Sequence, residues 1–174
     1  MAFCYLITLD IFLIVLEEAT IWETSGRSGT TSQYDSWHPN LIDGIAIGTG
    51  PGDGNCAISY RGNVGDRPWL SVKLNEPKKV VQVQLARRTD GKSESEGQGK
   101  NVRVQVGSSP TLKSTDPVCK EINQLSGTGL VDYECDQHHV GQYVIFSNDQ
   151  VYLAICEAKV FVKNSKLDDK EILG

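Results

Sequence analysis

The chain has 174 residues, enough for one domain with its own hydrophobic core and short tails. Its formal net charge is −5, from 17 Lys and Arg against 22 Asp and Glu, and no basic stretch forms a stripe for phosphates. These features exclude nucleic acid as an expected partner. The hydrophobic content of 39% is ordinary for a soluble globular protein.

The N-terminal segment is apolar. Residues 2–16 form an apolar run that only Asp10 interrupts. Because a membrane-spanning helix needs about 20 apolar residues, this run is short for a permanent anchor, and no stable membrane span is expected. Its length is typical of a secretory signal, although a basic start is missing, so we expect residues 1–18 to be a signal peptide cleaved near Ala19. The alternatives are a buried N-terminal segment or a mis-assigned first exon.

Short strands with alternating apolar and polar residues follow. In residues 80–85, for example, Val81, Val83 and Leu85 alternate with two glutamines. The pattern predicts an all-β fold, an antiparallel β-sandwich without a long helix, followed by a flexible tail at residues 164–174. The other strands are expected at residues 70–74, 102–106, 142–146 and 158–162, with turn-rich stretches at 44–55, 88–101 and 126–129.

No motif for catalysis is present. The Gly-rich stretch at residues 48–54 lacks the Lys-Ser/Thr pair that a phosphate-binding loop needs. The histidines are His38, His138 and His139, and no G-x-S-x-G or H-E-x-x-H motif accompanies them. The adjacent pair would point to opposite faces of an extended chain, which makes a poor metal site. We therefore predict that the chain is not an enzyme.

The cysteines indicate disulfides. There are five, and removal of the N-terminal segment would leave four, an even number that suits two disulfides in an oxidising, extracellular compartment. Four cysteines allow three pairings, and their spacing does not choose among them. The cysteines are Cys4, Cys56, Cys119, Cys135 and Cys156.

Two polar clusters are candidate binding sites. The oxygen donors of residues 40–44 and of Glu157 suit Ca²⁺, which takes 6–8 oxygen ligands, although an Asp-Gly pair alone is typical of a simple turn. The second cluster is Arg88 and Asp90, at the mouth of a polar loop. It offers a donor for sugar hydroxyls together with an acid that orients the donor. The alternative interpretation of this pair is a surface ion pair.

Five segments, in this order, together resemble the F-type lectins (fucolectins) and their discoidin-like relatives. The resemblance covers residues 20–163 and implies a jelly-roll, galactose-binding-domain-like sandwich that is secreted, binds fucosylated or related glycans and takes part in defence against microbes. The segments are NLIDG at 40–44, PWLSVKL at 68–74, LARRTD at 85–90, GQYV at 141–144 and LAICEA at 153–158.

The resemblance also implies two disulfides and a bound ion. The disulfides would join Cys56 to Cys156 and Cys119 to Cys135, whereas the family's additional disulfide between adjacent cysteines has no counterpart. The ion would be a structural Ca²⁺ that pins loops. Its ligands would be the carboxylates of Asp43 and Glu157, carbonyl groups of Asn40, Ile45 and Cys156, and Asn55 in place of a family serine.

The sugar site matches the family less completely. Arg88 and Asp90 fit the family's R-x-D, but Ile58 occupies the position of its histidine and Ser95 the position of its second basic residue. We expect the missing contacts to come from Lys92, Lys100 and Tyr60.

Two functions follow from the resemblance. The first is a calcium-containing lectin with an incomplete sugar-binding triad. The alternative is a discoidin-like structural or interaction module that has lost sugar binding. One hydrogen bond from an arginine to a hydroxyl contributes about 1.5–3 kcal/mol, so a single shallow site should bind weakly. A homo-oligomer would strengthen binding to arrayed glycans.

Overall fold

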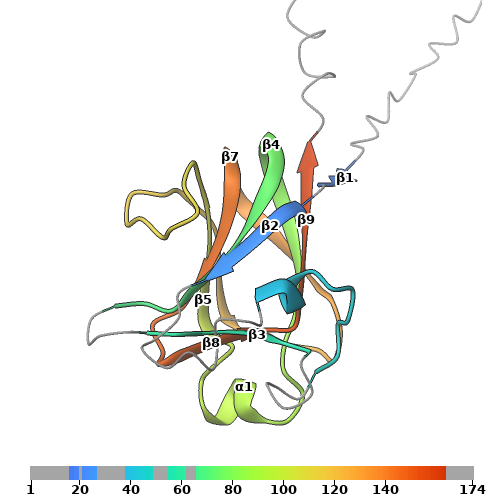
Figure 1. The fold of residues 1–174 in the computed structure, drawn as a ribbon, viewed down its shortest axis with the longest axis vertical. Helices are drawn as coiled ribbons and strands as arrows, with labels where there is room; N and C mark the ends of the chain where they lie inside the picture. Colours follow the sequence, from blue (N-terminus) through green and yellow to red (C-terminus); the bar gives the residue numbers. More distant parts are fainter. Residues whose placement is uncertain (1–15, 20, 27–37, 49–54, 62–65, 164–174) are drawn as a thin grey trace, which may run out of the picture.

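Strands make up most of the described chain, as the alternating pattern predicts (Figure 1). The computed structural model describes residues 16–19, 21–26, 38–48, 55–61 and 66–163. The strands are β1 (Leu16–Glu18), β2 (Ile21–Gly26), β3 (Ala57–Tyr60), β4 (Trp69–Ala86), β5 (Lys100–Gly107), β6 (Val118–Gln124), β7 (Val131–Ser147), β8 (Tyr152–Ile155) and β9 (Glu157–Lys163). The 3-10 turn η1 (His38–Leu41) and the short helix α1 (Lys92–Ser95) complete the described elements.

The long strands β4 and β7 connect the two halves of the larger sheet. Residues 69–73 of β4 pair with residues 143–147 of β7, and residues 78–85 pair with residues 131–141. The ladder is interrupted between Lys73 and Lys78, where both strands change neighbours. Before the interruption β4 also pairs with β2, and after it β4 pairs with β9, which in turn pairs with β1. The late half of β7 pairs with β5, and β5 pairs with β6.

The main hydrophobic core of the described residues lies between these halves. Leu70, Val72 and Leu74 come from the first half of β4, and Val83 and Leu85 from the second, yet all five belong to one buried cluster. Because side chains alternate between faces of a strand, the residues between them face outward. The two halves therefore fold over one another, and the predicted antiparallel β-sandwich is confirmed.

Strands β3 and β8 form a separate pair that crosses the lower part of the molecule, close to the loop that carries α1 (Figure 1). Its buried residues include Ala57, Leu153 and Ile155, which belong to the same core cluster. The pair therefore covers one end of the sandwich.

The structure corrects several predicted boundaries. The strands predicted at 70–74 and 80–85 are parts of the single strand β4, and the one predicted at 142–146 is the end of the longer β7. Strand β6 was not predicted. Its buried Cys119 and Ile122 are three positions apart, because the register with β5 shifts between Val104 and Gln105 and leaves Cys119 as an extra residue.

The ends of the chain only partly fall within the description. Residues 16–18, which belong to the predicted signal segment, pair with residues 161–163 of β9. Cleavage near Ala19 stays a prediction, and residues 1–15 and 164–174 lie outside the described residues. Among the residues described, no helix is long and apolar enough to cross a membrane.

Candidate functional site

Three segments that are far apart in sequence meet at one end of the sandwich. We call this region the rim and define it as residues 40–48, 88–99 and 156–157. Gly48 forms a parallel bridge with Arg88, and the Thr89 N–H donates to the Gly48 carbonyl at 3.0 Å. The Cys156 N–H donates to the Ala86 carbonyl at 2.8 Å. The rim thus brings the predicted calcium residues next to the predicted sugar residues.

Both implied disulfides are confirmed. Cys56 is bonded to Cys156 across a sequence separation of 100, and Cys119 to Cys135 across a separation of 16. The first disulfide lies against Gly48, where a Cβ atom would approach Cys56 Sγ to 2.7 Å. Only glycine fits this contact without displacement, so the rim loop packs directly on the disulfide.

Asp43 and Glu157 face the same loop turn. The Gly44 N–H donates to Glu157 Oε2 at 2.9 Å, and the Ile45 N–H donates to Asp43 Oδ1 at 2.8 Å. Glu157 is only 4% exposed. Burial raises the pKa of Glu157 to about 6; the hydrogen bond from Gly44 opposes this rise, and the negative charge of Asp43 adds to it.

This donor set fits a divalent cation chemically. Two carboxylates whose charges repel, one of them buried, are stabilised when a cation lies between them. Asn55 also reaches this loop, because its Nδ2 donates to the Ile47 carbonyl at 3.4 Å. No three His, Cys, Asp or Glu side chains cluster as metal ligands anywhere in the described residues, so any calcium site here depends on carbonyl oxygens in addition to the two carboxylates.

Arg88 points into the protein and makes several contacts there. It is 3% exposed, and its Nε and Nη2 donate to the two carboxylate oxygens of Asp90, with Nε at 3.2 Å from Oδ1. Its Nη1 donates to Gln98 Oε1 at 2.9 Å. Burial alone would raise the pKa of Asp90, but hydrogen bonds from Arg88 and from the Lys92 N–H outweigh this effect and the pKa is lowered.

The network continues to the surface of the 88–99 loop. The Gln98 amide donates to Glu96 Oε2 at 2.7 Å, and Glu96 lies 3.5 Å from Lys92 Nζ, one helical turn away. The side chains of Asp90 and Lys92 are 22% and 50% exposed. A ligand at the rim would therefore meet Asp90 and Lys92 first, with Arg88 beneath them.

The other predicted sugar contacts are more scattered. Tyr60, at the end of β3, packs against Tyr152 with 5.1 Å between ring centroids. Lys100 is exposed at the start of β5. Ile58, at the family's histidine position, is 2% exposed and is one of the buried hydrophobic residues. Sugar contact by Arg88, Asp90, Lys92, Lys100 and Tyr60 stays a prediction.

Two residues that shape the rim were not predicted from the sequence. Gln98 fixes the buried guanidinium of Arg88, and Gly48 allows the loop to approach the disulfide. Neither belongs to a motif with a fixed spacing. Only the pairing of distant segments shows what each residue contacts, so the sequence carried no signal for either role.

The fold is shared with carbohydrate-binding proteins of known structure. An f-lectin (fucolectin) from the serum of striped bass, Morone saxatilis, matches 82% of this chain at a TM-score of 0.62 and 18% identity, but this match spans only 45% of the fish chain. A fucose-binding module from Streptococcus pneumoniae matches 81% of this chain and 91% of its own length, at a TM-score of 0.58 and 20% identity. CBM62 of Clostridium thermocellum Xyl5A matches 84% and 97%, at a TM-score of 0.61 and 17% identity.

At these identities the comparisons show the fold alone, which is that of the F-type lectins and discoidin-like modules. No protein-family model and no curated protein sequence matches the chain.

Proposed function

We propose that this chain is a secreted, non-catalytic glycan-binding module that recognises fucosylated or related glycans at the rim. The shared fold supports this proposal, since two proteins with that fold are named as a fucolectin and a fucose-binding module. Two disulfides suit an oxidising compartment. Because one fold can serve many functions, the proposal depends on the rim itself.

The observation that carries the proposal is the fixed pair of Arg88 and Asp90 at the rim. Arg88 holds the Asp90 carboxylate in one orientation, and the backbone N–H of Lys92 also donates to Asp90, at 3.2 Å. The ammonium group of Lys92 is exposed on the same loop. A sugar hydroxyl can donate to the Asp90 carboxylate and accept from the Lys92 ammonium group. In this proposal Arg88 is a positioning residue, and Asp90 and Lys92 contact the sugar.

Calcium belongs to the same proposal. The carboxylates of Asp43 and Glu157 would hold the ion together with carbonyl groups of Asn40, Ile45 and Cys156, and Asn55 would complete the set. Bound Ca²⁺ would screen the repulsion between the two carboxylates and fix the loop at residues 40–48 against β9. Sugar contact would remain with the 88–99 loop.

A glycan array followed by calorimetry with L-fucose and the Lewis b antigen tests the proposal. We expect wild-type protein to bind fucosylated glycans, and Lys92→Ala to weaken binding about tenfold by removing one charged hydrogen bond. Lys79→Ala, which removes the same charge from the middle of β4, is the matched control. Light scattering would show whether the chain forms a homo-oligomer, which would strengthen binding to arrayed glycans. If the wild type binds no fucosylated glycan, the proposal fails.

One observation favours a second candidate, a discoidin-like interaction module without sugar binding at the rim. The Arg88 guanidinium is buried and already bonded within the protein, and a buried Ile58 replaces the family's histidine. Ile45 and Ile47 are exposed on the neighbouring loop and suit a protein or lipid surface. Sedimentation with phosphatidylserine vesicles tests this candidate, because Ile47→Ser should reduce binding to them.

A further inference from the structure

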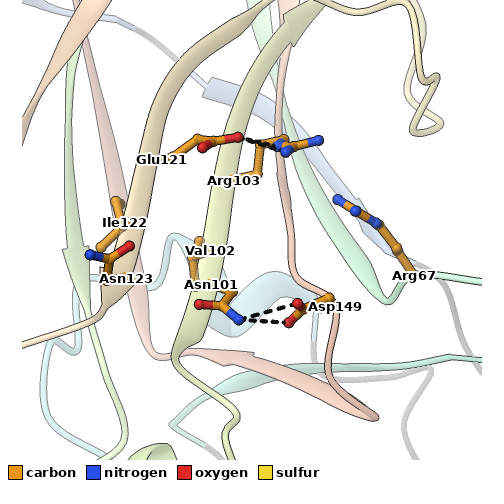
Figure 2. Close-up of a pocket in the computed structure, with 8 residues that line it drawn as sticks. All are labelled: Arg67, Asn101, Val102, Arg103, Glu121, Ile122, Asn123 and Asp149. Carbon is orange, nitrogen blue, oxygen red and sulfur yellow. Dashed lines mark hydrogen bonds and ion pairs between the residues drawn. The ribbon is translucent and has the colours of Figure 1, made fainter.

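A groove lies away from the rim, on the outer face of the larger sheet. It consists of two adjoining pockets of about 150 Å³ and about 370 Å³ that share Arg67 and Arg103 as lining residues. Asn101 and Asp149 line one end and Leu112 the other. Together the pockets reach the size of small-molecule sites, about 300–1,000 Å³. We call this feature the side groove, and Figure 2 shows the residues of its smaller pocket.

The strand register builds the floor of the side groove. Trp69 of β4 pairs with Ser147 of β7, Ser147 pairs with Arg103 of β5, and Arg103 pairs with Glu121 of β6. Directly paired residues of antiparallel strands point to the same face. The four side chains therefore form one row across four strands on the outer face.

The loop between β5 and β6 forms a wall above this row. Ser71 Oγ donates to the Pro110 carbonyl at 3.0 Å, which ties the loop to the outer face. Gln105 Nε2 donates to the carbonyls of Lys113 and Asp116, at 3.2 Å and 2.8 Å. These contacts fix the loop residues that line the larger pocket, so the side groove is a built feature of the fold.

The polar groups of the side groove are unequally engaged. Arg103 donates to Glu121 Oε1 from Nε at 2.9 Å and from Nη2 at 2.6 Å. Asn101 Nδ2 donates to both carboxylate oxygens of Asp149, at 3.2 Å and 3.1 Å. Arg67 points toward these residues in Figure 2. Its side chain forms no hydrogen bond or ion pair with any described residue, and it is exposed.

A second, independent feature lies beneath the groove. Ser147 is fully buried, and its hydroxyl has no hydrogen-bond partner among the described residues. The register places it between Trp69 and Arg103 on the groove face of the sheet. Because an unpaired buried hydroxyl is costly, such groups usually pair with water or a ligand.

We propose that the side groove binds an uncharged saccharide. Arg67 and the free N–H groups of Arg103 would donate to sugar hydroxyls, and Asp149 would accept from one. The partly exposed Trp69 would cover the apolar face of a sugar ring. The inference rests on the proposed glycan-binding function but assigns it a second surface.

The local charges select the ligand class. Two arginines, Arg67 and Arg103, line the groove together with three acids, Asp66, Glu121 and Asp149, so the formal charge is −1. A carboxylated or sulfated sugar would meet this excess of negative charge. A neutral sugar can use donors and acceptors equally, which favours an uncharged ligand.

The test compares Arg67→Ala with Lys79→Ala on a printed array of uncharged glycans, followed by NMR titration with the strongest free oligosaccharide. We expect Arg67→Ala to weaken binding tenfold or more with an unchanged melting temperature, since one charged hydrogen bond is lost. Lys79→Ala should bind as the wild type does. The indole N–H resonance of Trp69, assigned with Trp69→Phe, should shift on titration.

The possible results separate this inference from the proposed function. The side-groove site is overturned if Arg67→Ala leaves glycan binding unchanged and the Trp69 resonance does not shift. The rim proposal still stands in that case if Lys92→Ala weakens glycan binding. Tighter binding of tetragalacturonate than of any uncharged glycan overturns the assignment of ligand class. Failure to bind any glycan overturns both proposals.

Discussion

The rim and the side groove each contain an arginine beside an acid, but the two regions use them differently. At the rim, Arg88 is buried, and its guanidinium is bonded to Asp90 and Gln98. In the side groove, Arg67 is exposed and has no bonded partner within the described chain, while Arg103 keeps part of its guanidinium open. The arginine that belongs to a recognisable motif is thus the one that stabilises the fold, and the arginine outside any motif is open to a ligand.

The presence of a motif does not decide whether its side chains are accessible to a ligand. Arg-x-Asp at a loop mouth predicts a pair, and the pair is present. Whether the donor faces solvent depends on the third residue, Gln98, which lies on the far side of the loop and fixes the guanidinium from within. We therefore expect changes at the buried Arg88 to affect mainly stability, and changes at the exposed Arg67 to affect mainly binding.

Loss of the disulfide beneath the rim should have the largest effect on stability. In the chain-entropy model, closing a loop of about 100 residues contributes about 4.7 kcal/mol and one of about 15 residues about 3 kcal/mol. Replacing Cys56 and Cys156 by alanine should therefore lower the free energy of unfolding more than replacing Cys119 and Cys135, as measured by urea denaturation. An equal or larger loss from the second pair would contradict the special role of the rim disulfide.

Arg88→Ala should have the next largest effect. It removes the hydrogen bonds that Arg88 donates to Asp90 and to the buried Gln98, and hydrogen bonds of charged groups contribute about 1.5–3 kcal/mol. The matched change Arg103→Ala breaks a more exposed pair, so it should cost about 1 kcal/mol or less. Chemical denaturation of both variants measures the difference. Equal losses would show that the two arginines do not differ as proposed.

Calcium should act on the rim. At a Ca²⁺ concentration about 100 times its dissociation constant, the gain in stability is about 2.7 kcal/mol, and EDTA should reverse it as a fall in melting temperature. Asp43→Asn should abolish the dependence by removing one of the two carboxylates, whereas Asp149→Asn in the side groove should preserve it. A melting curve that EDTA leaves unchanged would contradict the calcium proposal.

The features that depend on local pattern could be predicted from the sequence. Alternation in residues 80–85 and 102–106 predicted strands, and the resemblance gave both cysteine pairings, which the structure confirms. Strand β6 was not predicted, because one extra residue interrupts the alternation of its buried and exposed side chains. The side groove was not predicted either, because the row from Trp69 to Glu121 forms only when four strands align in register. No spacing along the chain encodes that row.

Arg67→Ala should have the smallest effect on stability, and its main signature should be electrostatic. Surface substitutions usually change the free energy of unfolding by less than about 0.5 kcal/mol, and Arg67 has no bonded partner within the described chain to lose. It does act on Asp149. Burial alone would raise the pKa of that carboxyl, but hydrogen bonds from Gln150 and Asn101, together with the charge of Arg67, lower it.

Removing Arg67 should therefore raise the pKa of Asp149, which carbon-detected NMR can follow. A lowered pKa contributes stability that is present above the unfolded value of 3.8 and is lost as the pH falls through the folded value. The variant should accordingly lose slightly less stability than the wild type below pH ~4. A pKa of Asp149 that does not move would mean that Arg67 lies too far from the acids of the groove to share a ligand with them. In that case the contrast between the buried Arg88 and the open Arg67 would no longer hold.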